Sequence, residues 1–254
     1  MIYTEQIPVM NDNYIYILVD KSTNQTACVD PGVTSEVINY LDNKNLGLNF
    51  ILNTHHHADH IGGNITLKKK YGCKVVGNKN DANRIPGIDI FMEEGDQLSI
   101  GNSVCSILEV SGHTNGHISY FFEKDFALFC GDTLFSLGCG RLFEGTPSQM
   151  VKSLKKIRSL PDDTKIYCAH EYTEANSRFA NYLTPDDSLL KKKIIEIKEK
   201  RSKNIPTVPT TLSEEKKLNP FLKFDNKSYL DSIGMDFISS SINFGRIRKL
   251  KDKF

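Results

Sequence analysis

The stretch Thr54-His55-His56-His57-Ala58-Asp59-His60-Ile61-Gly62-Gly63-Asn64 decides how the rest of this sequence is interpreted. It holds four potential metal donors: His55, His57, Asp59 and His60. Three consecutive histidines can also lie in a solvated loop, but an H-x-H-x-D-H spacing followed by two glycines is typical of a metal site. The stretch therefore predicts a metal centre.

The composition is that of a globular protein. With 254 residues and 39% hydrophobic side chains, the chain can bury a large core, alone or beside a smaller domain. A net charge of +1, with both signs interspersed, predicts neither a nucleic acid nor a membrane as a partner. The sequence has no apolar run of the roughly 18 to 20 residues that span a bilayer, and its N-terminus lacks the pattern of a signal peptide. We expect a cytoplasmic monomer.

Strand-like and helix-like segments alternate before residue 172. Residues 13–19 and 26–29 predict two antiparallel strands, and residues 35–41 predict a helix. Residues 50–52 predict a short buried strand that runs directly into the histidine stretch. Loop structure is expected at 78–95. Further strands are expected at 74–76, 97–100, 104–110, 118–122, 126–130 and 165–169, and helices at 65–71 and 147–159.

After His170 the sequence changes to amphipathic helical patterns. Thr173 is expected to cap one helix, Thr184-Pro185-Asp186-Asp187 to open a second, and Thr211-Leu212-Ser213-Glu214 to start a third that ends before Asn219-Pro220. We therefore predict an α/β domain over residues 1–172 and a helical domain over residues 173–254.

Three more candidate donors follow predicted strands: His113, Asp132 and His170. Together with the first four they make seven donors, which are too many for one tetrahedral ion and suit two ions that share a carboxylate. Imidazole and carboxylate donors without thiolate suit Zn²⁺, with Fe or Mn as alternatives. His56 and His117 do not fit the spacing, and we interpret them as supporting or core histidines.

The six cysteines form no C-x-x-C pair, and several lie in apolar runs. We expect them to pack as small hydrophobic side chains without disulfides. Cys130 and Cys168 each precede a candidate donor by two residues, so a role in metal binding is the alternative for these two.

The histidine stretch resembles the signature of the metallo-β-lactamase superfamily. Over nearly its whole length the chain resembles, more closely, the hydroxyacylglutathione hydrolase (glyoxalase II) family. Besides the histidine stretch, the segments that carry this resemblance are Ile7-Pro8-Val9, Asp12-Asn13-Tyr14, residues 138–146, His170-Glu171-Tyr172-Thr173, Asn219-Pro220-Phe221-Leu222-Lys223 and Arg248-Lys249-Leu250-Lys251-Asp252.

The resemblance implies an α/β fold, namely the αββα four-layer sandwich of that superfamily with a C-terminal helical domain. It implies that two divalent ions are bound and that Asp59 and Asp132 take part in catalysis. One ion would be held by His55, His57 and His113, and the other by Asp59, His60 and His170, with Asp132 bridging the two.

The resemblance also implies a substrate site for glutathione. Its residues would be Arg141, Leu142, Phe143, His170, Glu171, Tyr172, Arg248 and Lys251. The family often has Lys and Tyr where this chain has Arg141 and Phe143, so the cation is kept and a phenolic hydrogen bond is absent. The basic segment 246–253 could clamp the two carboxylates of a glutathione conjugate, whereas without the resemblance it would read equally well as a solvated tail.

Thioester hydrolysis is the reaction that suits these residues. Two metal ions lower the pKa of a shared water from about 15.7 to about 7 and polarise a carbonyl oxygen. A thiol with a pKa of about 8.5 leaves without a strong general acid. We expect hydrolysis of S-D-lactoylglutathione to D-lactate and glutathione, the second step of methylglyoxal detoxification. A persulfide dioxygenase and a nuclease of the same superfamily are the alternatives, and a non-catalytic scaffold is the least favoured.

Overall fold

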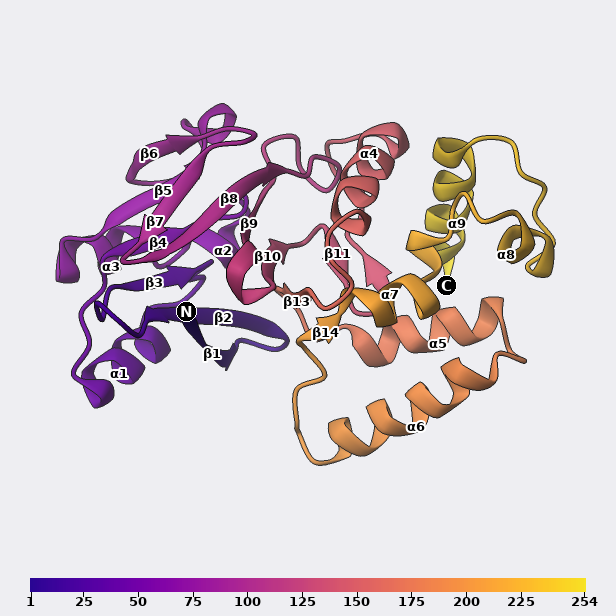
Figure 1. The fold of residues 1–254 in the computed structure, drawn as a ribbon, viewed down its shortest axis with the longest axis horizontal. Coiled ribbons are helices and arrows are strands. Elements are labelled where there is room, and N and C mark those ends of the chain that lie inside the picture. Colours follow the sequence, from indigo (N-terminus) through magenta and orange to yellow (C-terminus); the bar gives the residue numbers. More distant parts are fainter. The chain divides into compact units, whose positions relative to one another are not determined.

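The computed structural model describes residues 1–254, which form two compact units (Figure 1). The first unit contains residues 1–109 and 116–131, and the second contains residues 110–115 and 132–254. The second unit thus also includes residues 110–115 and 132–172 of the predicted first domain. The domain boundary at residue 172 stays a prediction.

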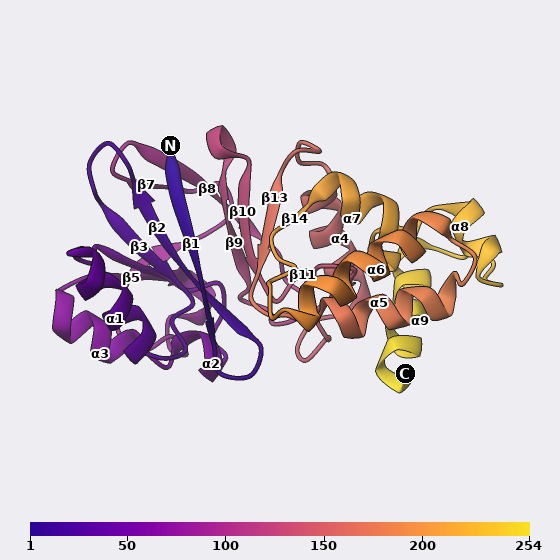
Figure 2. The same ribbon diagram turned by 90° about the horizontal axis from the view of Figure 1, so that it is seen from below.

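The first unit contains a six-stranded mixed sheet in the order β1-β2-β3-β4-β5-β6. Its first three strands are antiparallel and its last three pair in parallel. Their bounds are Ile2–Val9, Asn13–Asp20, Thr26–Val29, Phe50–Leu52, Lys74–Asn78 and Ile88–Met92. Helices α1 (Ser35–Lys44) and α3 (Asn64–Tyr71) lie along this sheet in both ribbon views (Figures 1 and 2). The predicted strands and helices of this region are confirmed.

Four neighbouring strands of a second sheet belong to the first unit, and they pair antiparallel in the order β7-β8-β9-β10. They span Gln97–Ile100, Ser103–Glu109, Ile118–Phe122 and Ala127–Gly131, close to the predicted ranges. The two sheets pack through large buried side chains. The rings of Tyr16 and Phe129 have centroids 5.4 Å apart, and the Tyr120 hydroxyl donates a 2.9 Å hydrogen bond to the Asn53 carbonyl. Because Asn53 follows β4 directly, this core contacts the segment that leads into the histidine stretch.

The loop predicted over residues 78–95 is wrong. It contains a 3₁₀ turn, η1 (Lys79–Asp81), and strand β6, which pairs in parallel with β5. The Asp89 carboxylate fixes this strand, since it accepts hydrogen bonds from Val75 N at 2.9 Å and from Lys68 Nζ at 2.8 Å. Only Met92 of β6 is buried, so this edge strand lacks the hydrophobic alternation from which a strand is predicted. Strand β1 was missed as well.

The second unit is mainly helical. Helix α4 (Pro147–Arg158), predicted over residues 147–159, begins with a capping box of Thr146 and Gln149 and packs against α9 (Ser240–Lys253). Helices α5 (Thr173–Leu183) and α6 (Ser188–Ser202) lie side by side. Helix α7 (Leu212–Leu218) is capped by Thr211, as predicted. The remaining elements are β11 (Leu134–Phe135), β12 (Gly138–Cys139), β13 (Lys165–Cys168), β14 (Thr210–Thr211), η3 (Pro220–Leu222) and α8 (Lys227–Ser232).

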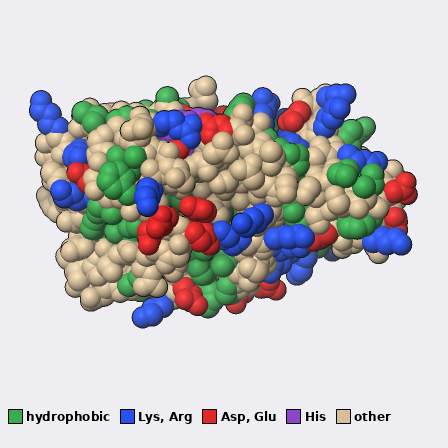
Figure 3. Space-filling model, turned by 90° about the horizontal axis from the view of Figure 1, so that it is seen from above, with side chains coloured by type: hydrophobic (Ala, Val, Ile, Leu, Met, Phe, Trp, Pro, Cys, Tyr) green, Lys and Arg blue, Asp and Glu red, His purple; other side chains and the backbone are tan.

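All six cysteines are buried free thiols. No helix has the length and apolar character needed to cross a membrane. On the face drawn in Figure 3, Lys and Arg side chains are interspersed with Asp and Glu side chains.

Candidate metal centre

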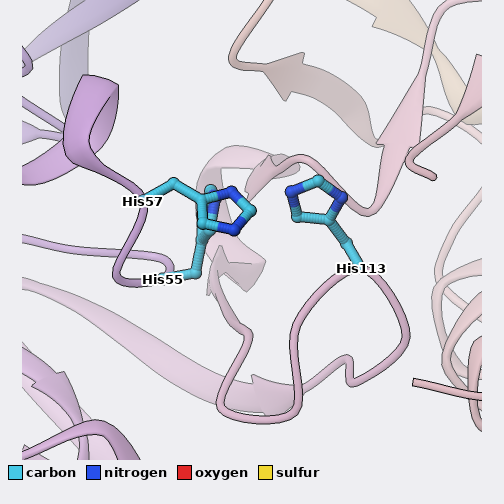
Figure 4. A group of neighbouring side chains, drawn as sticks. All are labelled: His55, His57 and His113. Atoms are coloured by element: carbon cyan, nitrogen blue, oxygen red, sulfur yellow. The ribbon is translucent and has the colours of Figure 1, made fainter. Parts of the chain in front are cut away.

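The histidine stretch begins directly after β4, as predicted. His55 is fully buried, and the short helix α2 (Ala58–Ile61) carries Asp59 and His60. Figure 4 shows His55 and His57 extending from this loop, and their ring centroids are 4.6 Å apart. A side chain would not fit at Gly63, because its Cβ would lie 2.6 Å from the carbonyl oxygen of Pro31.

Asp30 orients this stretch from within the first unit. Its Oδ1 accepts a hydrogen bond from Thr54 N at 2.8 Å, and its Oδ2 accepts one from Thr54 Oγ1 at 2.7 Å. The same Oδ2 lies 3.0 Å from Nδ1 of His60. A carboxylate can only accept there, so the His60 proton lies on Nδ1 and the lone pair on Nε2. This is the tautomer that binds a metal through Nε2.

Asp59 lies beside the metal-binding nitrogen of His60. Its Oδ2 lies 3.4 Å from His60 Nε2 and accepts a 2.9 Å hydrogen bond from Asn13 Nδ2. Asn13 begins β2, so a residue distant in sequence fixes the orientation of this carboxylate. The Asp59 side chain is 38% exposed, which leaves room for a ligand beside it.

In the second unit, the carboxylate of Asp132 faces two histidines. Its Oδ2 lies 3.4 Å from Nε2 of His113, and its Oδ1 lies 3.4 Å from Nε2 of His170. All three residues are buried. Nδ1 of His113, which Figure 4 draws on its own loop, lies 2.9 Å from the carbonyl oxygen of Arg141. His113 is therefore also the tautomer with a lone pair on Nε2.

These separations fit metal ligands. Two atoms each about 2.0 to 2.1 Å from a zinc ion at a tetrahedral angle lie roughly 3.3 to 3.4 Å from each other. Three donor pairs within the units have this spacing: His60 with Asp59, His113 with Asp132, and His170 with Asp132. Asp132 presents a different oxygen to each histidine, as a bridging carboxylate does. The donor set therefore fits binuclear metal binding.

The two remaining histidines have other contacts. Nδ1 of His56 lies 3.2 Å from Oδ2 of Asp81, a fully buried carboxylate. His117 is fully buried and stacks on His55, with centroids 4.7 Å apart and planes 15° apart. Its Nδ1 lies 3.1 Å from the Ile118 carbonyl oxygen. These positions fit the interpretation of both as supporting or core histidines.

A cavity of about 660 Å³ lies in the second unit, and two of the candidate donors, His113 and Asp132, line it. The rest of its wall combines four cations and the carboxylate of Asp252 with aromatic and small polar side chains. These include Phe135, Cys139, Arg141, Phe143, Tyr172, Asn176, Arg178, Arg248, Lys251 and Phe254. Five of the eight predicted substrate residues thus line one cavity, whereas Leu142, His170 and Glu171 are not among the lining residues.

The two basic residues of α9 at the cavity are held in different ways. Arg248 is only 6% exposed, and its Nη1 donates a 3.0 Å hydrogen bond to the Cys139 carbonyl. Its Nη2 lies 2.9 Å from Asp252 Oδ1. Lys251 donates from Nζ to the Ala175 carbonyl at 3.1 Å. Burial, together with the neighbouring Arg248, Arg178 and Arg141 charges, lowers the pKa of Lys251 to about 8. At this cavity the four cations thus outnumber the two carboxylates, Asp132 and Asp252.

Residues 12–170 match the family model of the metallo-beta-lactamase superfamily, and residues 171–254 match the model of the hydroxyacylglutathione hydrolase C-terminus. The chain is 46% identical over 249 residues to a hydroxyacylglutathione hydrolase of Methylococcus capsulatus, covering 98% of this chain and 97% of the relative. The chain belongs to the hydroxyacylglutathione hydrolase family. A hydroxyacylglutathione hydrolase of Pelagibacter ubique is 47% identical over 248 residues, covering 98% of both chains.

Among solved structures, ETHE1 from Myxococcus xanthus superposes with a TM-score of 0.71 at 25% identity, covering 97% of this chain and 90% of that one. The family matches confirm the predicted α/β metallo-β-lactamase fold with a C-terminal helical region. In this hydroxyacylglutathione hydrolase family member, His55, His113, Asp132 and His170, four of the candidate metal donors, each lie in a segment that follows a strand.

Some residues at the site of this family member were not predicted. Asp30 directly follows the predicted strand over residues 26–29 and has no predicted role, and Asn13 is predicted only to begin the strand over residues 13–19. Asn176 and Arg178 on α5 line the cavity, and no sequence pattern predicted them. No local pattern indicates that Asp30 contacts His60, which is 30 residues away.

Glu171 contacts a different part of the second unit. Its Oε2 accepts a 2.8 Å hydrogen bond from Thr207 N, and its Oε1 accepts a 2.6 Å bond from Thr207 Oγ1. Arg201 lies 3.7 Å from the same carboxylate. The side chain of Glu171 thus ties the segment after β13 to the chain that precedes β14, while its neighbour Tyr172 lines the cavity.

Proposed function

We propose that this protein hydrolyses S-D-lactoylglutathione, and related 2-hydroxyacylglutathione thioesters, to glutathione and the free hydroxy acid. The observation that carries the proposal is that one cavity is lined both by candidate metal donors and by four cations. A glutathione thioester has two carboxylates and a reactive carbonyl at different ends, so it needs both kinds of residue. The names of the relatives at 46% and 47% identity point to the same substrate class.

The proposed metal site uses all seven donors. His55, His57 and His113 would hold one ion and Asp59, His60 and His170 the other, with Asp132 between them. The chemistry of the donors and the 3.4 Å spacings within each unit support this assignment. We propose Zn²⁺ as the metal, because neutral imidazoles and carboxylates without thiolate suit it, with Fe or Mn as the alternatives.

When bound, two divalent ions supply a water that is acidic at neutral pH and a Lewis acid for the carbonyl oxygen. The protein's own residues then have three tasks. Asp30 and the Arg141 carbonyl keep His60 and His113 in the tautomers that bind metal. Asp59, fixed by Asn13, would orient the nucleophile, and Asp132 offers one carboxylate oxygen beside each of its two histidine partners. No residue is needed to protonate the departing thiolate.

Recognition of the glutathione part falls to the cationic end of the cavity. Arg248 and Lys251 are held rigidly by backbone carbonyls, so little side-chain entropy is lost when they bind carboxylates. Phe143 is 63% exposed and offers an apolar surface without a phenolic donor, so in this chain the polar contact at that point comes from Arg141.

The test is steady-state kinetics of metal-replete protein on S-D-lactoylglutathione. R248A and K251A should each raise KM by roughly ten-fold with kcat little changed, since each removes a charge-assisted contact far from the reacting carbonyl. Lys249→Ala on the exposed side of the same helix is the matched control and should leave KM unchanged. Absence of thioesterase activity in the wild type, or an unchanged KM in R248A and K251A, would overturn the proposal.

We also propose that the protein acts as a cytoplasmic monomer on a small molecule, without a nucleic acid or membrane partner. The net charge of +1 and the mixture of charges in Figure 3 support the lack of a nucleic-acid partner. The molar mass in solution, measured by light scattering, tests the monomer. A mass of twice 28.7 kDa would contradict it.

A further inference from the structure

A short hairpin joins a proposed metal-binding carboxylate to a cavity cation. Strands β11 and β12 pair through Leu134 with Cys139 and through Phe135 with Gly138. The chain enters the hairpin from Asp132 and leaves it toward Arg141. A further hydrogen bond, from Gly140 N to the Thr133 carbonyl at 3.2 Å, closes its base. The position of this hairpin therefore determines the positions of both Asp132 and Arg141.

The hairpin is too short to fix its own position. Each strand has only two residues, and an isolated two-stranded hairpin is marginally stable even when longer. Leu137 in the turn has a φ of +57°, a conformation that non-glycine residues adopt only when their surroundings hold them. The hairpin thus depends on contacts from other elements.

Three side chains from the helices of the second unit bind the backbone of the turn. Glu215 Oε2 accepts a 2.8 Å hydrogen bond from Leu137 N. Asn219 Nδ2 donates to the carbonyls of Phe135 and Gly138, at 3.1 and 2.9 Å. Asn176 Nδ2 donates to the Ser136 carbonyl at 3.0 Å. Every residue from 135 to 138 thus has a backbone group bound by one of these side chains.

The three side chains, which we call the hairpin clamp (Asn176, Glu215 and Asn219), are themselves fixed. Glu215 and Asn219 are fully buried, and Asn176 is 7% exposed. Asn219 Nδ2 also lies 2.8 Å from Glu215 Oε2, and Asn219 Oδ1 accepts from Phe221 N at 2.9 Å. A Cβ at Gly138 would collide with the Asn176 side chain. Buried hydrogen bonds of this kind are costly to leave unmade.

We propose that the hairpin clamp positions the site: it holds β11 and β12 so that Asp132 and Arg141 keep the geometry that the reaction requires. Glu215 and Asn219 are positioning residues that act through the hairpin, and Asn176 holds the hairpin while it also lines the cavity. The inference rests on the proposed function for the identity of the substrate. The helical region thus has two roles. It carries Arg248 and Lys251, and through Glu215 of α7 it positions Asp132 without contacting the substrate.

The test compares E215A with E215Q in the full chain. In E215Q the amide oxygen can still accept from Leu137 N and Asn219 Nδ2, so KM for S-D-lactoylglutathione and bound metal per chain should stay within about two-fold of wild type. E215A leaves the turn without that acceptor. It should raise KM by roughly ten-fold and lower the bound metal per folded chain.

Two further variants separate positioning from stability. Leu230→Ala on α8 removes a fully buried side chain in the same unit and should lower the unfolding temperature without changing KM. Gly138→Ala displaces Asn176 and should raise KM even if E215A does not fold. The proposal is overturned if folded E215A and G138A match wild type in KM and bound metal, or if L230A changes both as E215A does.

Failure of the clamp proposal can be told apart from failure of the proposed function. If metal-loaded wild type does not hydrolyse the thioester, the function fails. The clamp is then judged by bound metal and by calorimetric affinity for glutathione alone. If wild type is active and E215A behaves like it, only the clamp fails.

Discussion

Nδ1 of His60 lies 3.0 Å from Oδ2 of Asp30, and both side chains are buried. The contact determines which nitrogen of His60 carries the proton, and it leaves Nε2 facing Asp59 Oδ2 at 3.4 Å. The same carboxylate holds Thr54, the first residue of the histidine stretch. Asp30 therefore controls the chemistry of a proposed metal ligand without being one.

Replacing Asp30 with Asn should weaken metal binding by about 10- to 100-fold. The amide keeps the shape and can still accept from Thr54 N, but its NH₂ group would donate to Nδ1 of His60. The proton of His60 would then move to Nε2, where it blocks coordination. Competition with a chromogenic chelator measures the effect.

Asp81→Asn is the matched control for that experiment. Asp81 is equally buried, and its Oδ2 lies 3.2 Å from Nδ1 of His56, a histidine outside the proposed ligand set. It should leave the metal affinity within about two-fold, since no ligand tautomer changes. Equal losses in the two variants would show that a general disturbance of the loop, and not the His60 tautomer, weakens the site.

The depressed pKa of Lys251 predicts a pH dependence of substrate capture. Its pKa is lowered to about 8, so the ammonium is present below pH 8 and is lost as the pH rises through that value. An anionic substrate binds the charged form, so kcat/KM, which reports the free enzyme, should fall above about pH 8. Initial rates between pH 6.5 and 9.5 at low substrate concentration measure this fall.

Lys251→Arg keeps the charge at every pH in that range. The fall that is due to Lys251 should therefore disappear in this variant, even if the absolute kcat/KM is lower. A fall of the same size and midpoint in Lys251→Arg would assign the pH dependence to another group.

Glu215 predicts a pH dependence of stability. Burial without a counter-charge raises its pKa from 4.5 to about 7 in the folded protein. The folded state therefore binds more protons than the unfolded state between these values, so stability decreases as the pH rises from 4.5 through 7. Relative to E215Q, the wild type should lose on the order of 3 kcal/mol between pH 4.5 and 8.

Urea unfolding of both proteins at several pH values checks this difference. The comparison with E215Q cancels groups common to both proteins, such as Asp20, whose pKa is lowered by hydrogen bonds from Ser103 and Ser22. A constant difference in unfolding free energy across the range would mean that Glu215 does not titrate there.

The parts that could be predicted from the sequence are those with local causes. The ligand spacing of His55 to His60 lies within one loop, and the cap of α4 at Thr146 needs only Gln149 three residues later. Strand β4 is a short apolar run that ends where the histidines begin. Each of these depends on neighbours within a few residues, which a pattern records directly.

The parts that could not be predicted depend on distant partners. Asp30 and His60 are 30 residues apart, and Leu137 and Glu215 are 78 apart. From the sequence alone, Glu215 in an amphipathic helix is expected to be exposed, because glutamates are rarely buried without a partner. Its partner, the backbone N–H of Leu137, is known only from the structure. Strand β6 was missed because its identity comes from pairing with β5 and from Asp89, and its own residues hardly alternate.

We propose that a binuclear metal site and the cavity lined by Arg248 and Lys251 together hydrolyse a glutathione thioester. Metal content and S-D-lactoylglutathione hydrolysis can be measured on one sample, before chelation, after chelation and after reloading with Zn²⁺. We expect two ions per chain, loss of activity when they are removed and recovery when they return. Full activity in metal-free protein, or no thioester hydrolysis by protein that holds two ions, would contradict it.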